Sequence, residues 1–179
     1  ALLLLLNVWL VGARSLWNYA FGILAVLLYA WVYFAARLYA LAALQALFLA
    51  LNVYGLVNWR ASVKAEGEVA VSRMTAREIA ATAAAIGLLV ATTALFLRSV
   101  TDAASPWWDS ITTALSLAAQ YWQARRRLES WALWALVNLV TIGLCATQQL
   151  WITAATYLLL LALVIYGWLR WRRAETKEI

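Results

Sequence analysis

Trp131, Trp134 and Asn138 occupy positions i, i+3 and i+7 of the apolar run ESWALWALVNLV, residues 129–140. An α-helix places side chains with this spacing on one face. An indole beside a carboxamide offers stacking and cation–π attraction to a ring, together with hydrogen bonds to its polar groups. Because an amide within an apolar segment needs a hydrogen-bond partner, the run predicts a binding face for an aromatic or cationic ring.

A second polar face follows Pro106, the only proline of the chain. Asp109, Thr113, Ser116 and Gln120 succeed one another at spacings of 4, 3 and 4, which aligns them along one helix. One interpretation is that Asp109 complements the helix dipole near the surface while the hydroxyls bond to carbonyls one turn earlier. We favour a water-lined path, since lipid offers these side chains no partner.

Amide and aromatic hydroxyl side chains recur in three other apolar segments. Amides can simply join neighbouring helices through hydrogen bonds. Their recurrence in most of the apolar segments favours a shared polar cavity instead. The candidate lining residues from these segments are Trp17, Asn18, Tyr19, Gln45, Asn52 and Tyr157.

Several kinds of chemistry are missing from the chain. There is no histidine and one cysteine, Cys145, which excludes disulfides, histidine-ligated metals and histidine-based triads. No nucleotide-binding motif is present, so the sequence predicts neither a cofactor nor an enzyme. No carboxylate falls near the expected middle of an apolar segment, where proton-coupled carriers place an ionisable group. The predicted mechanism is an uncoupled site that faces each side in turn.

The elements that position these residues are membrane helices. Hydrophobic residues make up 66% of the 179 residues and charged residues 12%, which is half the charged share of a soluble domain. Apolar stretches of this length span a bilayer. The expected helices cover residues 1–12, 16–36, 38–59, 76–98, 106–124, 128–147 and 150–170. The first of them is expected to be the remainder of a longer helix.

The basic residues test this number of crossings. With seven helices, twelve Lys and Arg residues fall on one side and only Arg37 and Arg98 on the other. The positive-inside rule then places the N-terminus outside and the C-terminus in the cytoplasm. The net charge of +6 is spread over breaks between apolar segments, which favours contact with a membrane surface over nucleic acid.

The chain also contains a repeated pattern. YGLVNWR at residues 54–60 returns as YGWLRWR at residues 166–172, and we call the shift from residue 54 to residue 166 the repeat offset. The pattern could recur by chance or as an interfacial anchor, but its place at the end of the third helix of each half favours duplication. Two parallel three-helix repeats joined by a linker helix are typical of some transporters. We expect a first repeat at residues 1–60, a loop and linker helix at 61–104, a second repeat at 105–173 and a tail at 174–179.

Most tryptophans of a membrane protein mark its interfaces with water. Seven of the twelve fall near expected helix ends, and we assign them to these belts, with Trp131 at the cytoplasmic mouth. The seven are Trp59, Trp107, Trp108, Trp122, Trp151, Trp168 and Trp171.

Three stretches resemble a known family. WNYAFG at residues 17–22, the run from Asp109 to Asn138 and the YGxxxW endings are similar to the PnuC nicotinamide riboside transporters of bacteria. The resemblance implies the 3+1+3 arrangement of SWEET transporters, a homotrimer in the bacterial inner membrane and facilitated diffusion of the unphosphorylated vitamin. A cytoplasmic kinase would then trap the substrate by phosphorylation for NAD biosynthesis.

The resemblance also suggests roles for the candidate residues. Trp134 would stack on the pyridinium ring, while Asn138 and Gln120 bond the carboxamide or the ribose. The opposite wall would be formed by Asn18, Tyr19, Gln45 and Tyr157. Thiamine, riboflavin or a sugar stay open as substrates, and a membrane scaffold that transports nothing stays open as a different class of function.

Overall fold

The computed structural model describes residues 2–100 and 106–175, which form seven α-helices. They are α1 (Leu2–Gly12), α2 (Trp17–Ala35), α3 (Tyr39–Glu66), α4 (Ala76–Val100), α5 (Pro106–Ala124), α6 (Ser130–Thr147) and α7 (Trp151–Glu175). The predicted number of helices is therefore confirmed. The expected repeat boundary at residue 105 and the tail beyond residue 175 lie outside the described residues.

Two helices run at least five residues past their expected ends. The sequence predicts that the third helix ends at residue 59 and the seventh at residue 170, where basic residues begin. The structure instead extends α3 to Glu66 and α7 to Glu175. Basic side chains end a membrane segment but not a helix, and α3 stops only where Gly67 adopts a φ of 80°.

Five helices are long and apolar enough to cross a membrane, namely α2, α3, α4, α6 and α7. The first helix is apolar but has only 11 residues, and α5 carries the polar stripe. Large apolar side chains lie on the outer surface, such as Trp31 at 72% exposed and Leu88 at 68%. Water would penalise such a surface whereas lipid accepts it, so the chain is a multi-pass membrane protein.

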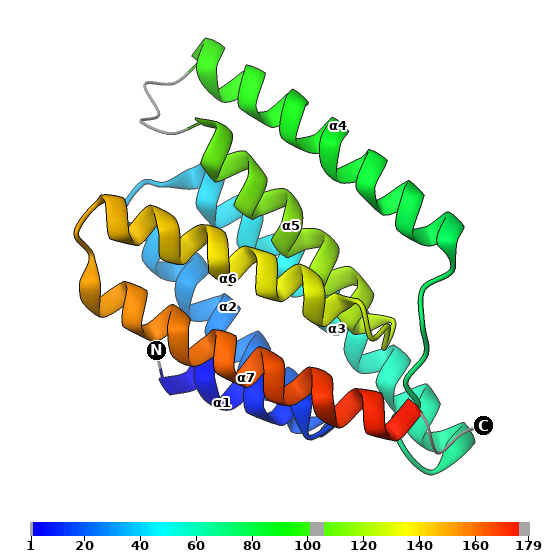
Figure 1. Cartoon of the computed structure of the whole chain (residues 1–179). Helices are drawn as coiled ribbons and strands as arrows, with labels where there is room; N and C mark the ends of the chain where they lie inside the picture. The colour runs from blue at the N-terminus through cyan, green and yellow to red at the C-terminus, as the bar shows by residue number, and fades with distance from the viewer. Residues whose placement is uncertain (1, 101–105, 176–179) are drawn as a thin grey trace.

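Six of the helices close into a ring. Around the ring the order is α1, α2, α3, α5, α6 and α7, and α7 returns to contact α1. The fourth helix packs against α5 alone among the described helices and stands outside the ring (Figure 1). One contact between them is a hydrogen bond of 2.9 Å from Trp122 Nε1 on α5 to Thr82 Oγ1 on α4.

Turns in the two halves of the chain repeat the same backbone geometry. Arg14 and Arg126, which are related by the repeat offset, both have positive φ, at 57° and 61°. Arg37 and Gln149, related in the same way, have φ of 60° and 58°. Side chains other than glycine rarely adopt this conformation, so two matched pairs are a specific correspondence. It agrees with the register of the sequence repeat.

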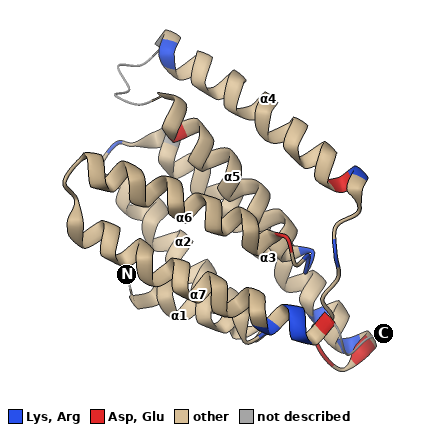
Figure 2. Ribbon diagram, in the orientation of Figure 1, with Lys and Arg blue, Asp and Glu red and all other residues tan. Residues whose placement is uncertain are grey.

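Charge divides the ring into two unlike ends (Figure 2). Basic residues gather around the α1–α2 turn, the α5–α6 turn and the ends of α3 and α7, and we call this the basic end. Arg37 and Arg98 lie at the opposite end. The structure thus gathers most basic residues at one end of the helices, as the sequence predicts.

A strap, residues 67–75, crosses the basic end between α3 and α4. Backbone bonds join Ser72 to the α5–α6 turn, with its nitrogen 3.1 Å from Arg126 O and its oxygen 2.9 Å from Leu128 N. On the other flank, Arg14 Nη1 donates to the Val69 carbonyl at 2.8 Å. The strap therefore ties both halves of the ring together at this end.

Ion pairs reinforce the strap. Arg14 pairs with Glu68 at 2.8 Å, and Arg73 pairs with Glu175 at the end of α7. The hydrogen bond and the charge of Glu175 raise the pKa of Arg73, so this guanidinium stays charged. Beyond the strap, Thr75 and Glu78 form a capping box that starts α4.

Candidate functional site

The ring of six helices encloses a cavity of about 380 Å³, and every one of the six helices contributes to its lining. This volume is in the range of sites for small organic ligands. No charged side chain is among the described residues that line it. Indole, phenol, amide and aliphatic groups make up nearly all of the surface that a solute would meet.

Eight of the twelve candidate residues from the sequence line this cavity. They are Asn18, Gln45, Asn52, Ser116, Gln120, Trp134, Asn138 and Tyr157. Their roles toward a substrate stay predictions, but the structure does bring these side chains from five helices to one place.

The other four candidates lie elsewhere. Trp17 is 70% exposed, and Asp109 is exposed in the first turn of α5. Thr113 lies one turn later on α5 and does not line the cavity either. The cavity meets α5 only from Ser116 onward, so the first half of the polar stripe is not part of it. Tyr19 is 1% exposed and packs in an aromatic cluster beside the cavity.

The amide of Asn138 has a partner within its own helix. Its Nδ2 donates to the Trp134 carbonyl one turn earlier at 2.9 Å. Asn52 does the same on α3, where its Nδ2 donates to the Phe48 carbonyl at 2.8 Å. In both residues one of the two amino N–H groups is used in this way, and the carbonyl oxygen Oδ1 accepts no hydrogen bond from the described residues.

Two further asparagines in the cavity follow the same rule. Asn18 Nδ2 donates to the Ser15 carbonyl at 2.6 Å, and Asn7 Nδ2 donates to the Asn18 carbonyl at 2.5 Å. Each of these amides uses one of its two N–H donors on a backbone carbonyl, and its Oδ1 accepts no hydrogen bond from the described residues. The cavity is therefore rich in uncharged hydrogen-bond acceptors.

Gly22 makes room for this group of amides. A Cβ at this position would come within 2.7 Å of Asn52 Oδ1 and 3.1 Å of Asn7 Nδ2. Glycine on α2 thus lets an amide from α1 and an amide from α3 approach the same point. Alanine would have to displace the Asn52 oxygen.

Trp134 is held by a residue that the sequence analysis missed. Its Nε1 donates to Gln123 Oε1 at 2.7 Å, and Gln123 lines the cavity beside it. Gln123 follows Gln120 by three positions and so continues the polar stripe of α5, which could have identified it. Asn7 was missed as well, although it is the only polar residue between positions 2 and 12.

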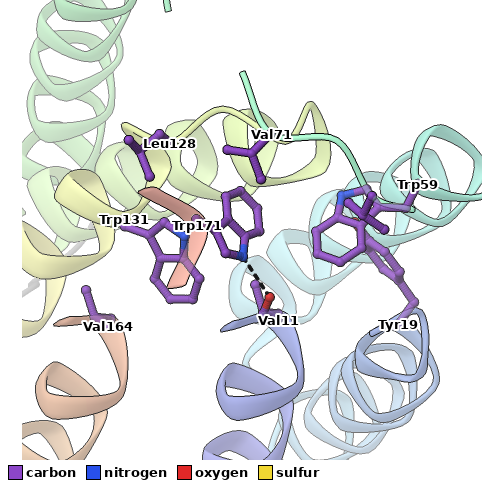
Figure 3. Close-up of a cluster of buried hydrophobic side chains, with 9 residues drawn as sticks. Val11, Tyr19, Trp59, Val71, Leu128, Trp131, Val164 and Trp171 are labelled. Atoms are coloured by element: carbon purple, nitrogen blue, oxygen red, sulfur yellow. Dashed lines mark hydrogen bonds between the residues drawn. The ribbon is translucent and has the colours of Figure 1, made fainter. Parts of the chain in front are cut away.

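A cluster of buried aromatic rings, which we call the aromatic closure, packs against the strap at the basic end (Figure 3). It consists of Tyr19, Trp59, Trp131 and Trp171, each at most 1% exposed. Tyr19 meets Trp59 edge to face with ring centres 5.2 Å apart, and Trp131 meets Trp171 in the same way at 5.4 Å. The two pairs touch through Trp59 and Trp171 at 5.7 Å. Val69 and Val71 of the strap belong to the same buried cluster.

Hydrogen bonds cross between the halves at this closure. Trp59 Nε1 on α3 donates to the Gln123 carbonyl on α5 at 3.2 Å. Trp171 Nε1 on α7 donates to the Val11 carbonyl on α1 at 3.0 Å, the bond drawn in Figure 3. The repeat offset relates the two donors to each other and the two acceptors to each other.

The closure corrects part of the tryptophan assignment. Trp107, Trp108, Trp151 and Trp168 are 43–66% exposed, as interfacial residues should be. Trp59 and Trp171 are buried completely, Trp131 is 1% exposed, and Trp122 is 7% exposed against α4. The prediction of an interfacial position was wrong for these four. Position near a helix end does not distinguish a ring that faces lipid from one that faces the axis of the bundle.

Comparison with known proteins gives a consistent result. The family model described as nicotinamide mononucleotide transporter matches residues 1–173. The nicotinamide riboside transporter PnuC of Escherichia coli strain K12 is 27% identical over 93% of this chain and 80% of its own length. The PnuC of Neisseria mucosa is 31% identical over 91% of this chain and 66% of its own length.

Two further relatives extend the comparison. The riboflavin/roseoflavin transporter RibM of Streptomyces davaonensis is 33% identical over 89% of this chain and 78% of its own length. A crystal structure of the vitamin B3 transporter PnuC superimposes with a TM-score of 0.76 at 28% identity. That match covers 97% of this chain and 78% of the other.

Proposed function

The chain belongs to the nicotinamide mononucleotide transporter family, and we propose that it carries nicotinamide riboside across a bacterial inner membrane by facilitated diffusion. Its relatives are named as transporters, and the chain is a transporter rather than an enzyme. The observation that carries the choice of substrate is the cavity, which joins a tryptophan to amide oxygens without any charged side chain among the described residues.

The cavity favours the riboside over the mononucleotide. A phosphate group is bound in proteins by arginine, lysine or helix N-termini. Neither Lys nor Arg is among the described residues that line the cavity. A phosphate dianion would lose its hydration there without gaining a counter-charge. The riboside has no phosphate and so avoids this desolvation cost.

The amide oxygens suit the charge of the riboside. Nicotinamide riboside has a pyridinium cation, a carboxamide NH₂ and ribose hydroxyl groups, all of which interact with acceptors. The Oδ1 atoms of Asn7, Asn18, Asn52 and Asn138, which accept no hydrogen bond from the described residues, supply such acceptors. The Trp134 ring adds stacking and cation–π attraction. Asn138 and Gln120 would bond the carboxamide or the ribose, opposite Gln45 and Tyr157.

Transport would proceed by alternating access. The aromatic closure and the strap seal the basic end, whereas Leu4 and Tyr29 line the cavity away from the closure and are 37% and 47% exposed. This state would accept the vitamin from the end opposite the closure. Opening of the closure would release it at the basic end, which the positive-inside rule assigns to the cytoplasm together with the C-terminus.

The two halves of the ring would provide the moving parts. We assign a first three-helix repeat to residues 1–60, a loop and linker helix to 61–104 and a second repeat to 105–173. The matched turns of positive φ and the matched closure support this division. No described carboxylate lines the cavity, which supports an uncoupled mechanism driven by the gradient of the vitamin. A cytoplasmic kinase would keep that gradient steep, and a homotrimer is carried over from the family resemblance.

Uptake of labelled nicotinamide riboside into liposomes that contain only this protein tests the proposal. We expect saturable uptake that stops at equal concentrations inside and outside and is insensitive to proton and sodium ionophores. Nicotinamide mononucleotide, thiamine and riboflavin should compete weakly. Dependence on an ion gradient would refute the uncoupled mechanism, and preference for riboflavin would refute the substrate. Light scattering of the purified protein tests the trimer.

A further inference from the structure

Gln123 takes part in both the cavity and the closure. Its side-chain Oε1 accepts the 2.7 Å bond from Trp134, which lines the cavity. Its backbone carbonyl accepts the 3.2 Å bond from Trp59, which belongs to the closure. The residue is 7% exposed and stands in the last turn of α5, one position before the helix ends at Ala124. No other described residue accepts one hydrogen bond from a ring that lines the cavity and another from a ring of the closure.

The other half of the chain has no such link. The repeat offset relates Gln123 to Val11, whose carbonyl accepts the matching bond from Trp171 at 3.0 Å. Valine has no side-chain acceptor, and the counterpart of Trp134 is Gly22, which has no donor ring. Val11 and Trp131 also line the cavity, so the closure meets the cavity in both halves. A hydrogen bond from a cavity ring to the residue that holds a closure ring is found in one half only of the described chain.

The closure itself is not fully satisfied. Tyr19 Oη and Trp131 Nε1 are buried and have no hydrogen-bond partner within the described chain. These two residues are also related by the repeat offset. A buried donor without a partner raises the free energy of the closed state, since opening would let water reach it. The Trp59 and Trp171 hydrogen bonds thus stabilise a closure whose other two rings, Tyr19 and Trp131, each bury a donor without a partner among the described residues.

We infer that Gln123 is a positioning residue that couples occupancy of the cavity to opening of the closure. A solute that stacks on Trp134 shifts the indole and hence the Gln123 side chain. Because the same residue holds Trp59 through its carbonyl at the end of α5, the shift weakens the Trp59 bond. This inference rests on the proposed function for the identity of the solute, and it adds how binding is signalled to the basic end.

A thiol reporter in the strap measures the opening. Val71 is 2% exposed in the closed state, and a Val71→Cys, Cys145→Ala background gives one reporter thiol. The purified full chain in detergent is labelled with a polar maleimide, with and without saturating nicotinamide riboside. We expect the riboside to accelerate labelling, and Gln123→Met to reduce the acceleration about fivefold, the effect of one hydrogen bond. Because Gln123 itself lines the cavity, calorimetry measures riboside affinity for each variant, and labelling is compared at a riboside concentration that saturates it.

Two further variants separate coupling from binding and folding. Trp134→Phe removes the donor of the same bond, and its double variant with Gln123→Met should lose no more coupling than either single variant. Gln120→Met is the matched control one turn earlier, because it makes the same substitution at a cavity residue that has no bond to the closure. It should weaken binding but leave the acceleration intact at saturation. Melting temperatures verify that each variant is folded.

The outcomes are distinguishable. Full acceleration in Gln123→Met would overturn the coupling role while leaving the proposed function standing. Riboside binding without any acceleration in the reporter background would overturn it as well. Equal loss of acceleration in Gln120→Met and Gln123→Met would overturn it too, because the effect would then be general damage in α5. Absence of riboside binding by the reporter protein itself would contradict the proposed function, and the coupling with it.

Discussion

Positions related by the repeat offset carry similar side chains in the aromatic closure and unlike side chains in the cavity. Tyr19 and Trp59 form an edge-to-face pair in one half, and Trp131 and Trp171 form its counterpart in the other. In the cavity the counterparts are Trp134 and Gly22, Gln120 and Val8, Gln123 and Val11, Asn138 and Val26, and Asn52 and Val164.

The difference follows from what each region has to bind. The closure brings the two halves against each other, so similar rings can meet across the axis with matched geometry. A solute with a ring at one end and a sugar at the other has no such symmetry, and two identical walls would each fit only half of it. The cavity thus places its indole and its α5 amides in the second half and leaves Val8, Val11 and Gly22 in the first.

The largest expected effect tests the symmetry of the closure. Gly55→Ala and Gly167→Ala would each place a Cβ into a ring, that of Tyr19 and that of Trp131 respectively. Because both rings are buried, we expect each variant to lose about 1–3 kcal/mol of stability and most of its uptake. Thermal unfolding and liposome uptake measure this. Gly143→Ala, on α6 with open space around it, is the control and should behave like the unmodified chain.

Unequal outcomes would break the comparison. A severe loss in Gly167→Ala beside a normal Gly55→Ala would mean that the second half alone forms the closure. Normal uptake in both variants would mean that transport does not require Tyr19 to pack closely on Gly55 or Trp131 to pack closely on Gly167.

A smaller effect is expected from the cavity. Trp134→Leu keeps an apolar side chain but removes the aromatic face and the donor to Gln123. Loss of a desolvated cation–π contact worth about 2 kcal/mol should weaken nicotinamide riboside binding about thirtyfold. Calorimetry on purified protein measures the change, and thermal unfolding verifies the fold. Binding that falls less than about threefold would show that the ring does not stack on the solute.

The sequence predicted the number of helices and several lining residues of the cavity, but not the aromatic closure. Hydropathy and the positive-inside pattern gave the correct number of helices, since the cost of burying charge in lipid acts on each segment separately. The spacing of amides along single helices predicted that Gln45, Asn52, Gln120 and Asn138 face a shared cavity, and all four line it, because one helical face can be read locally.

What the sequence did not predict depends on contacts between helices. Trp59 and Trp171 were assigned to the interface although both are fully buried, because the YGxxxWR pattern shows where they are along the helix but not which way they face. Tyr19 was assigned to the cavity although it packs on Trp59, one residue after Asn18, which does line it. A rotation of one helical position separates a cavity residue from a closure residue, and only packing decides it.

Gly22→Ala should have a more modest effect, confined to the first half. The added Cβ would lie 2.7 Å from Asn52 Oδ1 and must push this acceptor away. Loss of one hydrogen bond to the solute, worth about 1 kcal/mol, should weaken riboside binding about fivefold without changing the melting temperature greatly. Gly87→Ala on α4, which meets open space, is the matched control. An unchanged affinity would remove the Asn52 oxygen from the set of groups that bind the solute.

The smallest expected effect is a difference between two matched variants. Trp59→Phe and Trp171→Phe each remove the same volume and one hydrogen bond to the opposite half, to Gln123 O and to Val11 O. If the closure is symmetric in energy as well as in geometry, their losses of stability should agree within about 0.5 kcal/mol. Because only the Trp59 bond ends on the residue that also holds Trp134, only Trp59→Phe should alter the response of a strap thiol to the riboside. Equal stability with unequal response would place the coupling in one half of a symmetric closure, whereas equal responses would mean that both halves signal.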